Sequence, residues 1–576
     1  MQIDATCLSP QTTLEAEVAI VGAGPAGITL ALELERNGHS VLLIESGGDS
    51  YDADVQRLGD TVGGDPAHVP MSLATRRQIG GTSNLWAGRC VPFDPVDFEP
   101  RAIVDDARWP VGYTELEGYF ARACEWCVCG ESRFDAEQIA ELSSAELIPG
   151  WPGGEVLATS LERWSLPTNF GRVYRERLRA SHLVTVVGNL TCTEIVCTAD
   201  GRGVEHLRAS TLSGNRVPIR AKRYVLACGG VESTRLLFAS NRLHRDGIGN
   251  HSGHLGRWYM GHLGAAIADV RFRTPPAETI YGFERDAHGA YVRRRFSFAL
   301  DYLLEHELPN AALWLENPEI GDPSHESEIL SFIYLALTSP MGGRFVPEGI
   351  RRRKIDTEIR GSSVLHMRNI LRSLPRVVRF ALTFGYERYV RSGYKVPGIY
   401  IPSSSNTYRL YYHGEHIPHY DSQIFPVAER DALGMPRMST RLHFHSEDIQ
   451  SAIRVHEHFD RYLRRHELGG LEYLYQDPES AFRDQLLDGY HQAGTTRMSD
   501  RPEDGVLDSQ LAVHGFDDLF VASSSAFVTS GQANSTFMIV VIALRLADHL
   551  HRALRPALTV TTSQPARELE TMSPDN

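Results

Sequence analysis

A glycine-rich turn near the N-terminus limits what this chain can fold into more than any other sequence feature. The apolar run Val18–Val21 leads directly into Gly22-Ala23-Gly24-Pro25-Ala26-Gly27, which fits the pattern G-x-G-x-x-G. Apolar residues then recur at helical spacing as far as Asn37-Gly38, a helix stop signal. A second apolar run, 41–44, ends at Glu45. This order of strand, turn, helix, strand and acid predicts a dinucleotide-binding unit.

Each part of this motif has a physical reason. Gly22 permits the tight turn, Gly24 lets the backbone approach a pyrophosphate, and Gly27 lets the helix pack on the strand. The helix N-terminus offers free N–H groups and a positive dipole end to phosphates. Glu45 can accept hydrogen bonds from ribose hydroxyls. A purely structural glycine turn is the alternative interpretation, and the motif alone does not separate FAD from NAD.

Length and charge exclude several classes of protein. A chain of 576 residues predicts two to four domains. A net charge of −14 disfavours a nucleic-acid partner, because the phosphate backbone requires a basic surface. The longest apolar run, Phe537–Leu544, is far shorter than the ~18 residues needed to span a bilayer. Residues 1–10 lack a signal-peptide pattern, and eight cysteines do not make a disulfide framework, so we expect a cytoplasmic enzyme.

Four further segments bear on the cofactor. Arg76–Trp86 contains a Gly-Gly pair followed by Thr82, Ser83 and Asn84, which together suit a flat polar ring or a pyrophosphate. Arg223–Gly230 is predicted as a buried strand that returns to the nucleotide-binding sheet. The last two segments are Tyr490–Met498 and the stretch from Leu519 to Phe537. In the latter, Asn534, Ser535 and Thr536 are good N-cap residues for an apolar helix at about 538–549.

Taken in order, these motifs resemble the glucose–methanol–choline (GMC) flavoprotein oxidoreductases. The likeness runs from about Glu17 to Leu550 and is thinnest between about 265 and 485. It implies extended FAD covered by the C-terminal part of the chain. The expected cofactor contacts are Gly22, Gly24, Pro25, Ala26, Gly27, Glu45, Ser46, Arg76, Gly80, Gly81, Thr82, Ser83, Asn84, Trp86, Ala87, Cys192, Cys228, Gly229, Ser523, Ser524, Ser535 and Thr536.

The resemblance also assigns the chemistry. The family histidine that matches His491 faces flavin N5 and takes the hydroxyl proton of an alcohol, while hydride leaves carbon for N5. Asn534 would orient the same hydroxyl, and the helix N-terminus at Ser535 would stabilise negative charge on the reduced flavin. A structural core histidine is the alternative for His491.

The chain departs from the family pattern at three positions. Covalent members tether FAD through a histidine where this chain has Leu85, so we expect non-covalent FAD. Ala87 replaces a hydroxyl residue that some relatives place near N5, and Ser535 replaces a proline found after the asparagine in many relatives.

The expected architecture is an α/β protein in which two domains are interleaved. Residues 14–100, 160–262 and 484–553 would form a Rossmann-like FAD domain of the GMC type. Residues 101–159 and 263–483 would form an α+β substrate domain and lid with an antiparallel sheet, which begins with the alternating run Ile267–Phe272. Residues 554–576 would be a disordered tail.

The leading hypothesis is oxidation of a polar, sugar-like, aminosugar or nucleoside-like alcohol, with oxygen, a quinone or a protein as electron acceptor. A lyase related to the hydroxynitrile lyases and a non-catalytic flavin-binding protein remain the alternatives. The sequence does not identify the substrate.

Three other patterns have simpler interpretations. Cys124, Cys127 and Cys129 fit an apolar helical stripe better than a metal site. His413, His416 and His419, with Glu415, are predicted in a loop that is solvated or faces substrate, with metal binding as the alternative. His443 and His445 are predicted to alternate on a strand.

Residues 351–395 contain 12 Lys or Arg and 3 Asp or Glu. They predict an amphipathic helix pair, broken or kinked at Pro375, with a solvated basic face. Contact with a membrane surface, an acidic partner or an electron acceptor is the alternative.

Overall fold

The computed structural model describes residues 1–9, 12–104, 107–166, 169–339, 361–391 and 393–555. The predicted disordered tail lies almost entirely outside these residues, and so do positions 351–360 of the basic segment.

The nucleotide-binding unit forms where the glycine motif predicts it. Strand β2 (Leu14–Val21) leads into α1 (Pro25–Arg36), and β3 (Val41–Ile44) pairs with β2 in parallel. The sheet continues in the order β1-β7-β3-β2-β10-β9-β8, with β20 also beside β10. The remaining strands are β1 (Gln2–Asp4), β7 (Val184–Gly188), β8 (Thr191–Cys197), β9 (Val204–Ser210), β10 (Arg216–Leu226) and β20 (Leu519–Val521).

The FAD domain is assembled from distant parts of the chain, as predicted. β10 pairs with β2 in parallel, which places the strand before Gly229 in the same sheet as the glycine motif. β20 pairs with β10 in parallel and brings the C-terminal segment to this sheet. α9 (Gly230–Ala239) follows β10, and α17 (Ser535–Leu554) packs against α1. The last helix therefore begins three residues earlier and ends five residues later than the sequence suggested.

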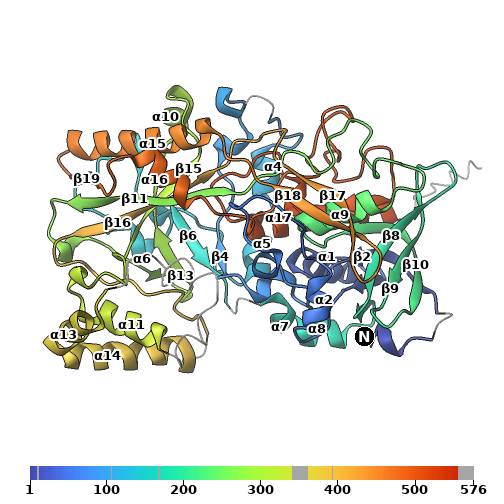
Figure 1. Ribbon diagram of the computed structural model, residues 1–576, viewed down its shortest axis with the longest axis horizontal. Helices are drawn as coiled ribbons and strands as arrows, with labels where there is room; N and C mark the ends of the chain where they lie inside the picture. Colours follow the sequence, from blue (N-terminus) through green and yellow to red (C-terminus); the bar gives the residue numbers. More distant parts are fainter. Residues whose placement is uncertain (10–11, 105–106, 167–168, 340–360, 392, 556–576) are drawn as a thin grey trace, which may run out of the picture.

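The second domain contains the predicted antiparallel sheet, in the order β19-β11-β16-β15-β14-β5. Its strands are β5 (Val156–Leu157), β11 (His262–Phe272), β14 (Phe296–Phe298), β15 (Ala311–Glu316), β16 (Thr407–Glu415) and β19 (Gly469–Tyr473). In Figure 1 this domain occupies the left half, where α15 (Ser446–Arg465) lies along the sheet. Smaller sheets are formed by β4 (Arg89–Cys90), β6 (Leu161–Trp164), β12 (Glu284–Arg285) and β13 (Tyr291–Arg294), and by β17 (Gln423–Arg430) with β18 (Pro436–Arg441).

The two largest hydrophobic cores divide the segment 101–159 differently from the expectation. Buried residues from Val104 to Cys129 join the core of the FAD domain, because α5 (Phe120–Cys127) packs on α17. Residues Leu147 to Ala158 instead belong to the core beneath the second sheet. The first half of this segment is thus part of the FAD domain's core.

The other helices are α2 (Ala53–Arg57), α3 (Met71–Ala74), α4 (Tyr113–Glu117), α6 (Ala140–Ser143), α7 (Phe170–Val173), α8 (Arg175–Ala180), α10 (Leu300–Glu305), α11 (Glu328–Thr338), α13 (Ser363–Arg372), α14 (Leu374–Gly385) and α16 (Pro478–Gln485). α13 and α14 are separated at Ser373, and Pro375 lies in the first turn of α14, so the predicted break occurs next to this proline. Among the described residues, no helix combines the length and the apolar character that crossing a bilayer requires.

Two predictions about histidines were wrong. His443 and His445 follow the end of β18 instead of alternating on a strand, and His445 is the N-cap of α15. His413 lies on β16 and not in a loop, because the strand extends to Glu415 before Pro418 interrupts the backbone hydrogen bonding.

Candidate active site

A cleft within the FAD domain, lined by both its N-terminal and its C-terminal segments, holds most of the predicted nucleotide-binding residues. Gly22 has a φ of 105°, and a Cβ there would lie 2.5 Å from the carbonyl oxygen of Ala227. A Cβ on Gly24 would have only the Gly81 Cα within 4 Å, at 3.9 Å, and one on Gly229 would meet nothing. Since both glycines line the cleft, a ligand can approach their backbone closely.

Two helix N-termini open into this cleft. Pro25 and Ala26 of α1 and Ser535 and Thr536 of α17 all line it. An N-terminus attracts negative charge, so α1 suits a pyrophosphate and α17 suits the pyrimidine edge of a flavin. The residues present therefore fit FAD.

Most of the predicted FAD contacts line the cleft. They are Gly22, Gly24, Pro25, Ala26, Glu45, Ser46, Arg76, Gly81, Thr82, Ser83, Cys192, Cys228, Gly229, Ser523, Ser524, Ser535 and Thr536. Gly27, Gly80, Asn84, Trp86 and Ala87 are not among the lining residues. Gly27 lets α1 pack, since a Cβ there would lie 1.9 Å from the oxygen of Gly22. Asn84 donates to the oxygen of Gly81 at 2.8 Å and holds the Gly-Gly loop.

Two carboxylates shape the nucleotide end of the cleft. Glu45 accepts hydrogen bonds from the backbone N–H groups of Ala23 (2.9 Å) and Gly47 (3.0 Å), one at each oxygen. Each oxygen keeps a lone pair that a ribose hydroxyl could use. Burial raises the pKa of Glu45, although these two backbone donors oppose the shift. Glu232, which was not predicted from the sequence, lines the same cleft and forms an ion pair with Arg77 at 2.8 Å.

His491 lines the cleft, and the side chain of Asn534 lies in direct contact with it. The Nδ2 atom of Asn534 is 2.9 Å from Nε2 of His491. The Oδ1 atom of Asn534 accepts a hydrogen bond from Arg89, which turns the amide N–H toward the histidine. Asn534 is the N-cap of α17, but its side chain makes no capping hydrogen bond. This amide therefore serves the site and not the helix end.

Asp488 holds the other side of the His491 ring. Its Oδ2 atom lies 3.2 Å from Nδ1 of His491 and accepts the backbone N–H of His262 at 2.5 Å. Oδ1 accepts the backbone N–H groups of Gly489 and Tyr490 at 2.7 and 2.8 Å. Burial acts to raise the pKa of Asp488, but the His491 ring and these donors lower it overall, so this carboxyl is ionised.

These contacts fix the tautomer of His491. A carboxylate only accepts hydrogen bonds, so Nδ1 of His491 carries the proton. The amide nitrogen of Asn534 only donates, so Nε2 presents its lone pair. The result is a neutral imidazole whose basic nitrogen faces the asparagine amide, which is the arrangement a general base needs.

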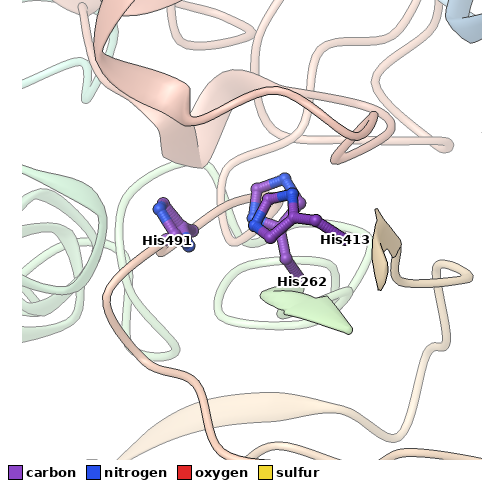
Figure 2. A group of neighbouring side chains, drawn as sticks. All are labelled: His262, His413 and His491. Carbon is purple, nitrogen blue, oxygen red and sulfur yellow. The ribbon is translucent and has the colours of Figure 1, made fainter. Parts of the chain in front are cut away.

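Two more histidines lie beside His491 (Figure 2). The rings of His262 and His413 stack with centroids 4.7 Å apart, and His262 meets His491 edge-on at 4.5 Å. Each of the three offers a nitrogen within 4.8 Å of the others. Burial, His491 and Arg89 lower the pKa of His262 to about 3, and burial with His262 and Arg89 lowers that of His413 well below its ordinary value.

Arginines surround a fully buried glutamate behind Asn534. Glu162 pairs with both Arg89 and Arg293, and Asp94 lies 3.8 Å from Arg295. The pKa of Glu162 is lowered, because the attraction of these arginines outweighs the effect of burial. The cluster fixes Arg89 and, through it, Asn534.

The cysteines predicted to be core residues are buried, and Cys90 lies near them. Cys124, Cys127 and Cys129 belong to the main hydrophobic core. Within the described residues, the only His, Cys and acidic group compact enough to hold a metal ion is the histidine trio.

Several site residues escaped the sequence reading: Asp488, Arg89, Glu162 and His262. Asp488 precedes His491 by three residues, and that D-x-x-H spacing could have suggested a partner. Arg89 and Asn534 are 445 positions apart, and their contact leaves no local signal.

Comparisons with known proteins match two parts of the chain to oxidoreductase models. A family model described as GMC oxidoreductase matches residues 422–543, and one described as FAD dependent oxidoreductase matches residues 17–293. The 2-methyl-1,2-propanediol dehydrogenase of Mycolicibacterium austroafricanum is 22% identical over 93% of this chain and 95% of its own. The paromamine 6'-oxidase of Streptomyces fradiae is 26% identical over 51% of this chain and 61% of its own.

Among solved structures, pyridoxine 4-oxidase from Mesorbium loti has the same fold, with a TM-score of 0.52. It is 17% identical, and the match covers 93% of this chain and 99% of that one. The chain is therefore similar to FAD-dependent oxidoreductases over residues 17–293 and to GMC oxidoreductases over residues 422–543.

Proposed function

We propose that this protein oxidises a CH–OH group of a polar, sugar-like alcohol to a carbonyl. One observation carries the proposal: at the end of the FAD cleft, His491 presents a lone pair on Nε2 beside the amide of Asn534. A substrate hydroxyl that displaces this contact can donate to Nε2 and accept from the amide at the same time.

Each residue then has a defined role. His491 removes the hydroxyl proton, and Asn534 holds the substrate oxygen. Asp488 keeps the proton on Nδ1 and stabilises the imidazolium that forms when Nε2 gains the substrate proton. Arg89 fixes the amide of Asn534. FAD, when bound, supplies the acceptor for the hydride that leaves the carbon, so the alcohol loses one proton and one hydride.

We also propose that FAD is bound without a covalent link. Leu85 has no nucleophile, and the thiols that line the cleft are poor ones. Burial raises the pKa of Cys228 to about 12 and also raises that of Cys192, so both stay protonated near neutral pH.

The substrate class follows from the relatives and from the site. A propanediol dehydrogenase and an aminosugar oxidase are both among the similar proteins, and both names imply alcohols that carry further polar groups. The polar side chains around His491 are consistent with such a substrate.

Anaerobic mixing with a panel of alcohols tests the proposal. We expect sugars, diols or aminosugars to bleach the oxidised flavin band, with one carbonyl product per flavin reduced. If a substrate is cleaved while the flavin stays oxidised, or if no alcohol in the panel reduces it, the proposal is wrong. Mixing the reduced enzyme with oxygen or a quinone then identifies the electron acceptor.

A further inference from the structure

Two imidazole nitrogens beside His491 make no hydrogen bond within the described residues, although Nδ1 of His262 lies 3.9 Å from the carboxylate oxygen Oδ2 of Asp488. Nε2 of His262 lies 3.2 Å from the carbonyl oxygen of Ser530, and Nδ1 of His413 lies 2.8 Å from that of Gln532. Nδ1 of His262 is buried and makes no hydrogen bond. For Nε2 of His413 no hydrogen bond is present within the described part of the chain.

These contacts define which nitrogens carry protons. A carbonyl oxygen only accepts, so the nitrogen facing it must donate. Both rings are neutral near pH 7, because burial and the neighbouring positive charge lower the pKa of each. The open atoms, Nδ1 of His262 and Nε2 of His413, are therefore lone pairs that require hydrogen-bond donors.

A metal ion is the first alternative for such lone pairs, but it fits poorly. The third lone pair, on His491, already faces the Asn534 amide, which Arg89 holds in place. The guanidinium of Arg89 also adds positive charge close to the histidines.

We propose that His262 and His413 form a subsite that accepts hydrogen bonds from a second hydroxyl of the substrate, next to the one that reacts. The protein would then select vicinal diols and polyols over simple alcohols. The inference rests on the proposed role of His491.

The test compares matched alcohols. We expect kcat/KM for anaerobic flavin reduction to be about 100-fold higher with 1,2-propanediol than with 1-propanol, since a buried polar site rejects an analogue that lacks its hydroxyl. His262→Phe and His413→Phe should each bring this ratio toward one. His456→Phe is the matched control. Like His262, His456 is buried and its Nε2 has no hydrogen-bond partner among the described residues, but its ring stacks on Tyr412, between α15 and the sheet. An unchanged ratio in both site variants would overturn the inference.

A binding measurement separates this inference from the oxidation itself. Pinacol and tert-butanol have no hydrogen on the carbinol carbon, so neither can be oxidised. Calorimetry with the holoenzyme should show tighter binding of pinacol, reduced in His413→Phe. If no alcohol reduces the flavin but pinacol is preferred, the oxidation proposal fails and the subsite stands. Equal affinities, or stoichiometric zinc in the purified protein that is lost in His413→Phe, would overturn the subsite.

A separate observation concerns the helices α13 and α14, where large apolar side chains face solvent. The basic face was expected to be the solvated one, yet Leu371 and Leu382 are 68% and 71% exposed. The exposed apolar residues of this segment are Val364, Leu365, Met367, Leu371, Leu374, Val378, Leu382, Tyr386, Tyr389 and Val390. The helices lie at the lower left of Figure 1, at the end of the molecule away from α1.

The charge around these side chains indicates the partner. Residues 361–391 contain six arginines and one acid, Glu387, in a chain whose net charge is −14. Arg368 and Arg379 have no ion-pair partner among the described residues, whereas Arg372 pairs with Glu326. Exposed apolar groups interleaved with arginine on a helix are typical of binding to an anionic lipid surface.

We infer that the exposed apolar residues and arginines of α13 and α14 together form a surface that binds an anionic membrane. Flotation of the holoenzyme with vesicles should show at least about tenfold more binding to phosphatidylglycerol-containing vesicles than to pure phosphatidylcholine. Leu371→Asp with Leu382→Asp should abolish it, and the exposed Leu243→Asp, in the FAD domain, should not. Equal binding of parent and double variant, or a dimer that the double variant disrupts without any vesicle binding, would overturn this inference.

Discussion

Replacing Asp488 by asparagine should change which nitrogen of the His491 ring carries the proton. The carboxylate accepts four hydrogen bonds: the backbone N–H groups of Gly489 and Tyr490 at one oxygen, and those of His262 and the His491 ring at the other. Asparagine can satisfy the pair at one oxygen, but its NH₂ group then faces two donors. To relieve this clash, the His491 ring must move its proton from Nδ1 to Nε2.

The rate loss follows from that change. A ring protonated at Nε2 cannot take the substrate proton, and the equivalent tautomer change in the serine protease triad costs about 10⁴ in kcat. We expect flavin reduction in Asp488→Asn to fall by roughly 10³–10⁴. The unfolding free energy should also fall by about 1–3 kcal/mol, because the backbone N–H of His262 loses its acceptor.

The assay is anaerobic stopped-flow reduction, with urea unfolding measured on the same preparations. Asp97→Asn provides a matched control. Burial and the neighbouring carboxylates raise the pKa of Asp97 to about 8, so near neutral pH this group is already uncharged like asparagine. We expect the control to reduce its flavin within about threefold of the parent. If Asp488→Asn also stays within threefold, Asp488 does not set the tautomer of His491.

Three other predictions test separate parts of the account. Arg89→Met frees the amide of Asn534, so flavin reduction should slow by about 10–150-fold, and an unchanged rate in stopped flow would refute that role for Arg89. Gly24→Ala should fold normally but bind FAD at least about tenfold more weakly, as measured by the fluorescence of released FAD. Gly22→Ala should fail to fold. Normal FAD affinity in Gly24→Ala would contradict the close approach of the pyrophosphate to this glycine. Burial lowers the pKa of His456 to about 4, so between pH 6.5 and 4 the unfolded chain binds the extra proton and stability falls as pH falls. The unfolding free energy of both proteins, measured by urea titration, should fall from pH 7 to pH 5, but that of His456→Gln should fall by about 2 kcal/mol less than that of the parent. An equal fall in both proteins would contradict the lowered pKa of His456.

The sequence predicts those parts of the fold whose signals are local. The run Val18–Val21, the glycine turn and Glu45 lie within one short segment, and the structure has β2, α1 and β3 there. The break at Pro375 is equally local, because proline lacks the backbone donor that a continuous helix needs. His491 and Asn534 were paired only through the family resemblance, and they meet at 2.9 Å.

The remaining site residues depend on contacts that no local pattern encodes. His262 and His413 come together because β11 and β16 pair in one particular register. A shift of one residue would turn both side chains to the other face of the sheet. His443 was misplaced on a strand because its alternation with His445 imitates a strand, whereas β18 ends at Arg441. For α13 and α14 the sequence predicted a solvated basic face but not the exposure of the apolar stripe, since hydrophobic periodicity does not reveal what covers such a stripe.

The central claim is that His491 is the base for alcohol oxidation beside FAD. The most direct test is a single-turnover measurement of His491→Ala and the parent, both loaded with FAD and mixed anaerobically with the best alcohol of the panel. The account predicts that the variant retains FAD and that its flavin is reduced at least about 10³-fold more slowly. If the flavin of the variant is reduced at the parental rate, His491 is not the base and the account is wrong.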